Sequence, residues 1–104
     1  MKRDKVLQRA ADCVLVDRNK NYGSPEESFG LIARFWQVYL EARPDSPLHG
    51  TDVAIMMDLM KTARLTANPS HEDSWIDKAG YAACGGEVAT ESEEVQLREA
   101  RAAL

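Results

Sequence analysis

Four charged side chains around one short turn are the residues of this sequence best placed to do chemistry. Lys61 and Arg64 come three residues apart before the turn at Asn68-Pro69, and Asp73 and Asp77 follow it four residues apart. Residues at these spacings share one face of a helix. Helices joined by so short a turn pack antiparallel, which predicts a single charged cluster. Its register places Arg64 nearest Asp73. It places Lys61 nearest Asp77.

Two kinds of chemistry fit this cluster, and both stay open at this point. In the first, carboxylates hold a divalent ion such as Mg²⁺ while bases neutralise phosphate. Asp73 and Asp77 would then be catalytic and metal-binding, with Glu27 as a further metal ligand. The phosphate-binding and ligand-binding side chains would be Lys61, Arg64, Tyr22, Trp75 and Tyr81. In the second, the charges form a salt-bridge network across the hairpin, and Asp73 caps its helix.

The common sequence signatures of nucleotide-binding and hydrolytic sites are absent. The sequence has no HExxH, GxxxxGK[ST], GxGxxG or GxSxG motif, so the zinc-protease, P-loop, Rossmann and α/β-hydrolase classes have no support. Its two cysteines, Cys13 and Cys84, lie far apart and form no CxxC pair. We expect both to be reduced, buried small residues of a cytoplasmic protein, outside any disulfide or zinc site.

Helical periodicity and cap signals predict four main helices that position these side chains. The first covers roughly residues 2–16. Its apolar stripe consists of Val6, Ala10, Cys13 and Val14. The second follows Ser24 as N-cap, with Pro25 in the first helical position and Glu27 at the capping-box distance. Pro44 ends it.

The third and fourth predicted helices form the arms of the hairpin. The third starts at Thr51 as N-cap, with Asp52 in its positively polarised first turn. The fourth starts at Ser70, with Asp73 at the capping-box distance. Gly85-Gly86 weakens or kinks it, because each glycine costs about 1 kcal/mol in a helix. One face of this helix, suited to a close helix contact or a two-fold interface, carries Trp75, Ile76, Ala79, Gly80, Ala83 and Gly86.

These elements predict an all-α fold, a single-domain bundle of four main helices with a central αα-hairpin. The helical domain covers residues 1–90, and residues 91–104 form a polar C-terminal helical extension. A chain this short has little core to spare, and its aromatic and small-residue faces exceed what one small bundle buries. We therefore expect a homo-oligomer, most simply a two-fold dimer.

Composition narrows the classes of partner. The chain carries 13 basic and 17 acidic residues, a net charge of −4 and a pI near 5.1. Binding to nucleic acid is disfavoured, because neutralising phosphates needs a surplus of Lys and Arg. No apolar run approaches the roughly 18–20 residues that span a bilayer, and the N-terminus lacks a signal-peptide core. We expect a cytoplasmic protein that binds itself and a nucleotide, with no nucleic acid and no membrane as partners.

A longer set of residues resembles a known protein family. Asp17-Arg18, Tyr22-Gly23 and Lys61-x-x-Arg64 precede the string Asp73-Ser74-Trp75-x-Asp77-x-x-Gly80-Tyr81-Ala82. Over about residues 5 to 89, this set resembles an uncharacterised family of small phage and prophage proteins. The resemblance implies a protein of the host cytoplasm and assigns no activity.

More loosely, the chain is similar to the all-α nucleoside triphosphate pyrophosphohydrolases of the MazG-like group. That resemblance implies a helical, dimeric or tetrameric, Mg²⁺-dependent enzyme. Its metal would be held by an ExxE pair on one helix and an ExxD pair on the next. This sequence departs from the pattern, since Gly30 stands three residues after Glu27 and the carboxylates Asp73 and Asp77 are four residues apart.

Three functional hypotheses follow, and the sequence favours the first by a small margin. The first is a pyrophosphohydrolase-like enzyme in which Mg²⁺ held by Asp73 and Asp77 activates water while Lys61 and Arg64 neutralise the triphosphate. The second is a non-catalytic protein that sequesters a small phosphorylated molecule with the same bases. The third is a structural oligomerisation module whose charged cluster is an ion-pair network.

Overall fold

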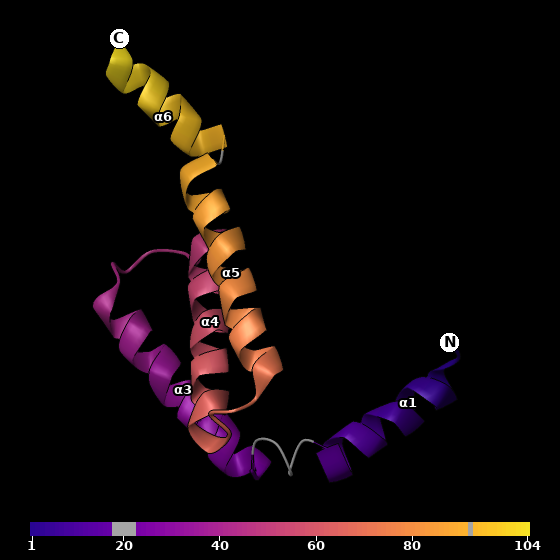
Figure 1. Cartoon of the computed structure of the whole chain (residues 1–104). Coiled ribbons are helices and arrows are strands. Elements are labelled where there is room, and N and C mark those ends of the chain that lie inside the picture. Colours follow the sequence, from indigo (N-terminus) through magenta and orange to yellow (C-terminus); the bar gives the residue numbers. More distant parts are fainter. Residues whose placement is uncertain (18–22, 92) are drawn as a thin grey trace.

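The computed structural model describes residues 1–17, 23–91 and 93–104, and every regular element in these ranges is a helix (Figure 1). The elements are α1 (Arg3–Asp12), the π-helical segment η1 (Cys13–Asp17), α3 (Pro25–Ala42), α4 (Gly50–Ala67), α5 (Glu72–Glu91) and α6 (Glu93–Ala103). The predicted all-α fold with four main helices and a central hairpin is confirmed. No helix in the described part of the chain is both long and apolar enough to cross a bilayer.

Helix α3 begins as its sequence predicts. The backbone N–H of Glu27 donates to Ser24 Oγ over 3.3 Å, and Pro25 occupies the first helical position. Glu26 and Glu27 place negative charge at the positively polarised end of the helix. The helix ends at Ala42, before the proline-containing loop that leads to α4.

The start of α4 differs from its prediction. Thr51 is not the cap, because His49 is the N-cap and Gly50 the first helical residue. The N–H of His49 donates to Asp52 Oδ2 over 2.8 Å. Asp52 therefore closes the first turn from the third helical position, as the acidic member of a capping box does.

The start of α5 is also shifted from its prediction. Ser70 is not the cap, since it lies in the turn and the helix begins at Glu72. The His71 Nδ1 and Ser74 Oγ atoms are 3.0 Å apart, and the N–H of Ser74 donates to the His71 carbonyl. His71, and not Ser70, is therefore the residue that directly precedes the helix. Ser74 is fully buried.

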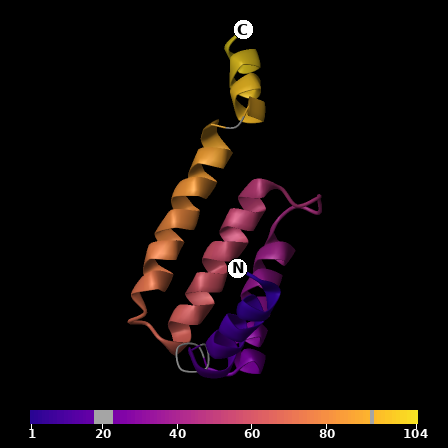
Figure 2. The ribbon, with the colours of Figure 1, turned by 90° about the vertical axis from the view of Figure 1, so that its right-hand side faces the viewer.

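The packed part of the fold is one layer of three helices with α4 in the middle (Figures 1 and 2). Helix α4 packs against α3 on one side and α5 on the other, and among the described residues α3 and α5 make no contact. Trp36 of α3 donates its indole N–H to the Met56 carbonyl over 2.6 Å, whereas Lys61 of α4 faces α5. Within the described part of the chain, both broad faces of the layer therefore lack a covering helix.

Helix α5 is continuous through Gly85-Gly86 to Glu91, so the two glycines do not end it. A Cβ atom on Gly85 would lie 2.8 Å from the Cβ of Ala54, closer than real Cβ atoms approach. A Cβ on Gly86 would meet nothing within 4 Å. Gly85 is therefore the residue that lets α5 lie directly against α4.

Helix α1 stands apart from this layer (Figure 1). Residues 1–16 are all exposed, and among the described helices α1 contacts only η1, which continues it. The radius of gyration is 17.7 Å, against about 13 Å for a compact domain of this length. The cysteines also differ from their prediction, since Cys13 and Cys84 are exposed and not buried.

Candidate functional site

The seam between α4 and α5 contains the predicted contact of Lys61 with Asp77. Lys61 Nζ lies 2.8 Å from Asp77 Oδ2. The Lys61 side chain is 10% exposed and that of Asp77 45%. The antiparallel register read from the turn is correct at this pair, because both residues lie two helical turns from it.

A second ion pair crosses the same seam with the opposite polarity. Lys78 Nζ lies 2.7 Å from Asp58 Oδ1 and donates to Thr62 Oγ1 over 2.6 Å. Neither Asp58 nor Lys78 belongs to the charged cluster predicted from the sequence. Their signal was available, because Asp58 and Thr62 are four residues apart on α4 and Lys78 lies at a similar distance from the turn.

We call the four charges Asp58, Lys61, Asp77 and Lys78 the seam quartet. It holds two carboxylates and two ammonium groups, each within 3 Å of a partner across the seam. The quartet is electrically balanced. Each carboxylate therefore has a lysine in the place where a metal ion would supply positive charge, and each lysine has a carboxylate where a phosphate would supply negative charge.

Two members of the predicted cluster lie outside the quartet. Asp73 is exposed in the first turn of α5, and among the described residues no ion pair joins it to Arg64. Arg64 is half-buried, with its Nε atom shielded from solvent. The ion pair with Lys61 across the seam is made by Asp77, and the expectation that Arg64 lies nearest Asp73 stays a prediction.

The predicted metal ligands do not converge. Glu27 is exposed in the first turn of α3, on a different helix from Asp73 and Asp77. Among residues 1–17, 23–91 and 93–104, no three His, Cys, Asp or Glu side chains are grouped so that they could hold a metal ion. Mg²⁺ binding stays a prediction from the sequence.

The predicted aromatic ligand-binding residues lie in three different settings. Trp75 is 54% exposed, and its indole N–H donates to the Pro69 carbonyl over 2.9 Å, which leaves the ring toward solvent. Tyr81 is half-buried at the seam. Tyr22 lies outside the described residues.

Asp52 and Arg43 are the centre of a hydrogen-bond network of which sequence reasoning noted only that Asp52 lies in the first turn of its helix. The carboxylate of Asp52 accepts from the Tyr39 hydroxyl over 2.5 Å, from Arg43 Nε and Nη2 over 3.0 and 3.2 Å, and from the His49 N–H. Arg43 also donates to Ser46 and Pro47 in the loop. We call Tyr39, Arg43, His49 and Asp52 the Asp52 hub. It ties the end of α3 to the start of α4.

The hub shifts the ionisation of two of its members in opposite directions. The hydrogen bond from Tyr39 and that from the His49 backbone, together with the Arg43 charge, hold the pKa of Asp52 below its ordinary value against the effect of burial. The same hydrogen bond to Asp52, with burial and the nearby negative charge, raises the pKa of Tyr39. A charged Asp52 and a neutral Tyr39 therefore stabilise each other.

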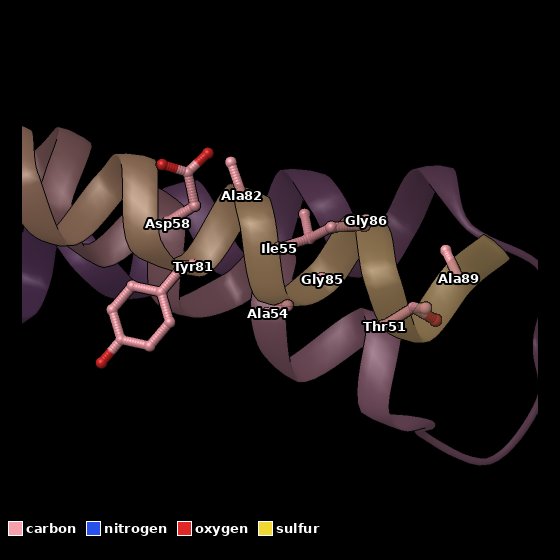
Figure 3. A pocket seen from close by; sticks show the side chains of 9 residues that line it. All are labelled: Thr51, Ala54, Ile55, Asp58, Tyr81, Ala82, Gly85, Gly86 and Ala89. Atoms are coloured by element: carbon pink, nitrogen blue, oxygen red, sulfur yellow. The ribbon is translucent and has the colours of Figure 1, made fainter. Parts of the chain in front are cut away.

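A shallow groove follows the seam on one broad face of the layer (Figure 3). Helix α4 lines it with Thr51, Ala54, Ile55 and Asp58. Helix α5 lines it with Tyr81, Ala82, Gly85, Gly86 and Ala89. We call this the seam groove; its volume is about 310 Å³ and its surface is mainly apolar. A groove of this kind suits an apolar helix or ring better than a triphosphate.

Sequence comparison finds a family of unknown function and two similar proteins from phages. The sequence model of the family described as Domain of unknown function (DUF6378) matches residues 5–89. The chain is 38% identical over 96 residues to the Gene 55 protein of Mycobacterium phage D29, covering 92% of this chain and 61% of that protein. It is 36% identical over 77 residues to the Gene 55 protein of Mycobacterium phage L5, covering 74% and 47%. The chain thus spans about half to three fifths of these relatives, and no solved structure matches it.

Proposed function

We propose a structural role for this chain, which belongs to the DUF6378 family of uncharacterised proteins and resembles phage proteins over most of its length. It acts as a non-catalytic helical module that associates with further copies of itself. The observation that carries this proposal is the open three-helix layer, whose two broad faces no other described helix covers.

The small core supports self-association. Among the described residues, the buried apolar side chains are Ile32, Ala63 and Leu65. Larger apolar side chains lie exposed on the same three helices, including Phe29, Val38, Val53, Ile55, Trp75 and Ile76. Apolar side chains that lie exposed in a contiguous patch mark an interaction site. A second copy of the chain supplies a surface of matching size and character.

The seam quartet supports a non-catalytic role. A pyrophosphohydrolase would need Asp77 for Mg²⁺ and Lys61 for phosphate, whereas these two side chains bind each other. Using Asp77 as a metal ligand would leave the buried Lys61 without its charged partner, at a cost in free energy. The hydrolase hypothesis and the phosphorylated-ligand hypothesis therefore become outcomes of the tests below.

Self-association predicts a molar mass above that of one chain. Light scattering and sedimentation equilibrium are expected to give a dimer or a higher multiple of 11.6 kDa. The measurement runs from low micromolar to about several hundred micromolar chain, the range in which modest interfaces assemble. A constant mass of 11.6 kDa over that whole range would contradict the proposed function.

Asp77→Asn separates the structural role of the quartet from a catalytic one. We expect the variant to lose about 1–2 kcal/mol of unfolding free energy in urea, because Lys61 stays buried while its charged partner is removed. Asp73→Asn makes the same chemical change one turn earlier at an exposed position. It should stay within about 0.5 kcal/mol of the unchanged protein.

The same samples test the enzyme hypothesis. The melting temperature of the unchanged protein is expected to be the same with and without nucleoside triphosphates and Mg²⁺. A ligand at about 100 times its Kd would add roughly 2.7 kcal/mol. Such stabilisation, or triphosphate hydrolysis that both Asp73→Asn and Asp77→Asn abolish, would replace the structural proposal with the enzymatic one.

A further inference from the structure

We infer that helix α1 pairs antiparallel with α1 of a second copy of the chain, across a two-fold axis at Ala10. This contact rests on the proposed self-association and adds which segment makes it. Residues 1–16 are all exposed, and among the described helices α1 contacts only η1, which continues it. A lone helix of this length is marginal in water and depends on the packing of its apolar face. Within the described part of the chain, that face has nothing to pack on.

The apolar positions of this segment have the same spacing in both directions from Ala10. Val6 and Leu7 precede Ala10 by four and three residues, and Val14 and Cys13 follow it at the same distances. All four flanking side chains are exposed. In an antiparallel pair centred on Ala10, Val6 of each copy faces Val14 of the other, and Leu7 faces Cys13. The smallest side chain then lies at the axis, where it allows the two helices to approach closely.

The order of charges along the segment selects the antiparallel arrangement. Residues 2–9 include four basic residues and one acidic residue, whereas residues 10–17 include two acidic residues and no basic one. Antiparallel pairing places the basic half of each copy beside the acidic half of the other, which attracts and orients the two helices. Parallel pairing would bring like charges together at both ends. The segment is therefore complementary in charge to its own reversed copy.

The same order of charges is unfavourable to a helix that stands alone. Lys2, Arg3 and Lys5 lie in or next to the first turn of α1, where Asp4 is the single acidic residue. Positive charge at a helix N-terminus opposes the helix dipole. The acidic half of an antiparallel partner supplies negative charge at this end. Because each chain holds one such segment, the partner that supplies it is a second chain.

The seam groove is a poorer match for this helix. Among the described residues that line it, Asp58 alone is charged, and Lys78 already binds that carboxylate. The groove therefore offers an apolar surface but no free negative charge for the basic half of α1. A reversed copy of α1 offers both, and a two-fold pair satisfies the two chains through one repeated contact.

Two matched substitutions test the apolar contact. Ala10→Glu places a charge at the proposed axis, and Gln8→Glu places the same charge about half a helical turn away, at an equally exposed position. By sedimentation equilibrium, we expect Ala10→Glu to weaken association by tenfold or more and Gln8→Glu by less than about threefold. The urea midpoint at low chain concentration should match the unchanged protein in both variants, because α1 packs on none of the three helices of the layer.

A second matched pair tests the order of charges. Arg3→Glu reverses one charge of the basic half, and Arg34→Glu makes the same change at an exposed position of α3. We expect Arg3→Glu to weaken association about fivefold, because a two-fold pair contains the change twice, and Arg34→Glu by less than about twofold. An acidic residue in the first turn favours the single helix. Weaker association of Arg3→Glu therefore cannot come from a less stable α1.

Disulfide formation determines the direction of the pair. All chains carry Cys13→Ala and Cys84→Ala, and each has one new cysteine. Under oxidation with diamide, Ala10→Cys is expected to join with a second copy of itself. A mixture of Val6→Cys and Val14→Cys chains is expected to give joined chains of one kind with the other, several-fold more than either kind with itself.

The outcomes separate this pairing from the proposed function. A monomeric unchanged protein would remove both. An associating protein in which Ala10→Glu binds as well as Gln8→Glu would overturn the α1 pairing alone and leave the faces of the layer as the contact. Val6→Cys that joins with itself in preference to Val14→Cys would overturn the antiparallel arrangement. A lower urea midpoint for Ala10→Glu, with association unchanged, would show that α1 packs on its own layer instead.

Discussion

Asp52→Asn is expected to lower the melting temperature by roughly 10 °C at neutral pH. Asp52 is buried and accepts four hydrogen bonds, two of them from the Arg43 guanidinium. Asparagine removes the negative charge and replaces one acceptor oxygen by a donor. Arg43 then loses its ion-pair partner, and one of the N–H or O–H donors loses its acceptor. Thermal unfolding followed by circular dichroism measures the change.

Two further variants test whether the loss of stability comes from the Asp52 hub or from the loss of any negative charge. Asp45→Asn makes the same change at an exposed position of the same loop and should move the melting temperature by less than about 2 °C. Tyr39→Phe removes one donor to a charged acceptor and should cost about 1–2 kcal/mol, measured in urea. Equal melting temperatures for Asp52→Asn and Asp45→Asn would show that the hub does not hold α3 to α4.

The same variant also has an expected dependence on pH. The pKa of Asp52 is lower in the folded chain than in the unfolded one. Its contribution to stability is therefore fully present above about pH 4, the unfolded pKa, and is lost as the pH falls through the folded value. Tyr39 has a raised pKa, so its contribution is present below about pH 10 and is lost above it. Asp52→Asn should flatten the acid limb of the unfolding free energy.

Gly85→Ala and Gly86→Ala are expected to change stability in opposite directions. The Cβ atom added at Gly85 would lie 2.8 Å from Ala54 Cβ, so the helices must separate at their closest approach. We expect a loss of about 1–3 kcal/mol, as for other overpacked contacts. At Gly86 the added methyl meets nothing within 4 Å. Alanine should therefore stabilise the helix there by about 0.5–1 kcal/mol.

Urea unfolding at low chain concentration gives both values without a contribution from association. Gly80→Ala is a further control, because Gly80 also has nothing within 4 Å and lies outside the seam groove. It should gain stability as Gly86→Ala does. A stabilising Gly85→Ala would mean that α4 and α5 lie farther apart than in the present structure.

Local signals predicted the helices well, and contacts between distant segments limited the rest. Ser24 and Pro25 mark the start of α3 because a cap depends on neighbouring residues alone. Thr51 failed as a cap because Tyr39 of the preceding helix and Arg43, the C-cap of that helix, hold Asp52 and with it the turn at His49. Nothing in the local sequence around residue 51 carries that information.

The charged cluster was also predicted only in part, because it depends on contacts between the two helices of the hairpin. The turn gave the register that pairs Lys61 with Asp77, because distance from the turn is a property of the sequence. It could not give the rotation of α5 about its own axis. That rotation is set by Gly85 lying against Ala54, and it turns Lys78 toward Asp58 and leaves Asp73 in solvent.

A layer in which the middle helix touches both neighbours, and the outer helices do not touch each other, has consequences for how the chain unfolds. Its interactions form a nearest-neighbour array, as in a repeat protein, and its stability is close to a sum over two interfaces. An outer helix can open alone while the other pair stays formed, so amide protons of α3 and α5 should exchange with solvent faster than those of α4. Cooperativity therefore depends on α4, which contributes Asp52 to one interface and Asp58 and Lys61 to the other.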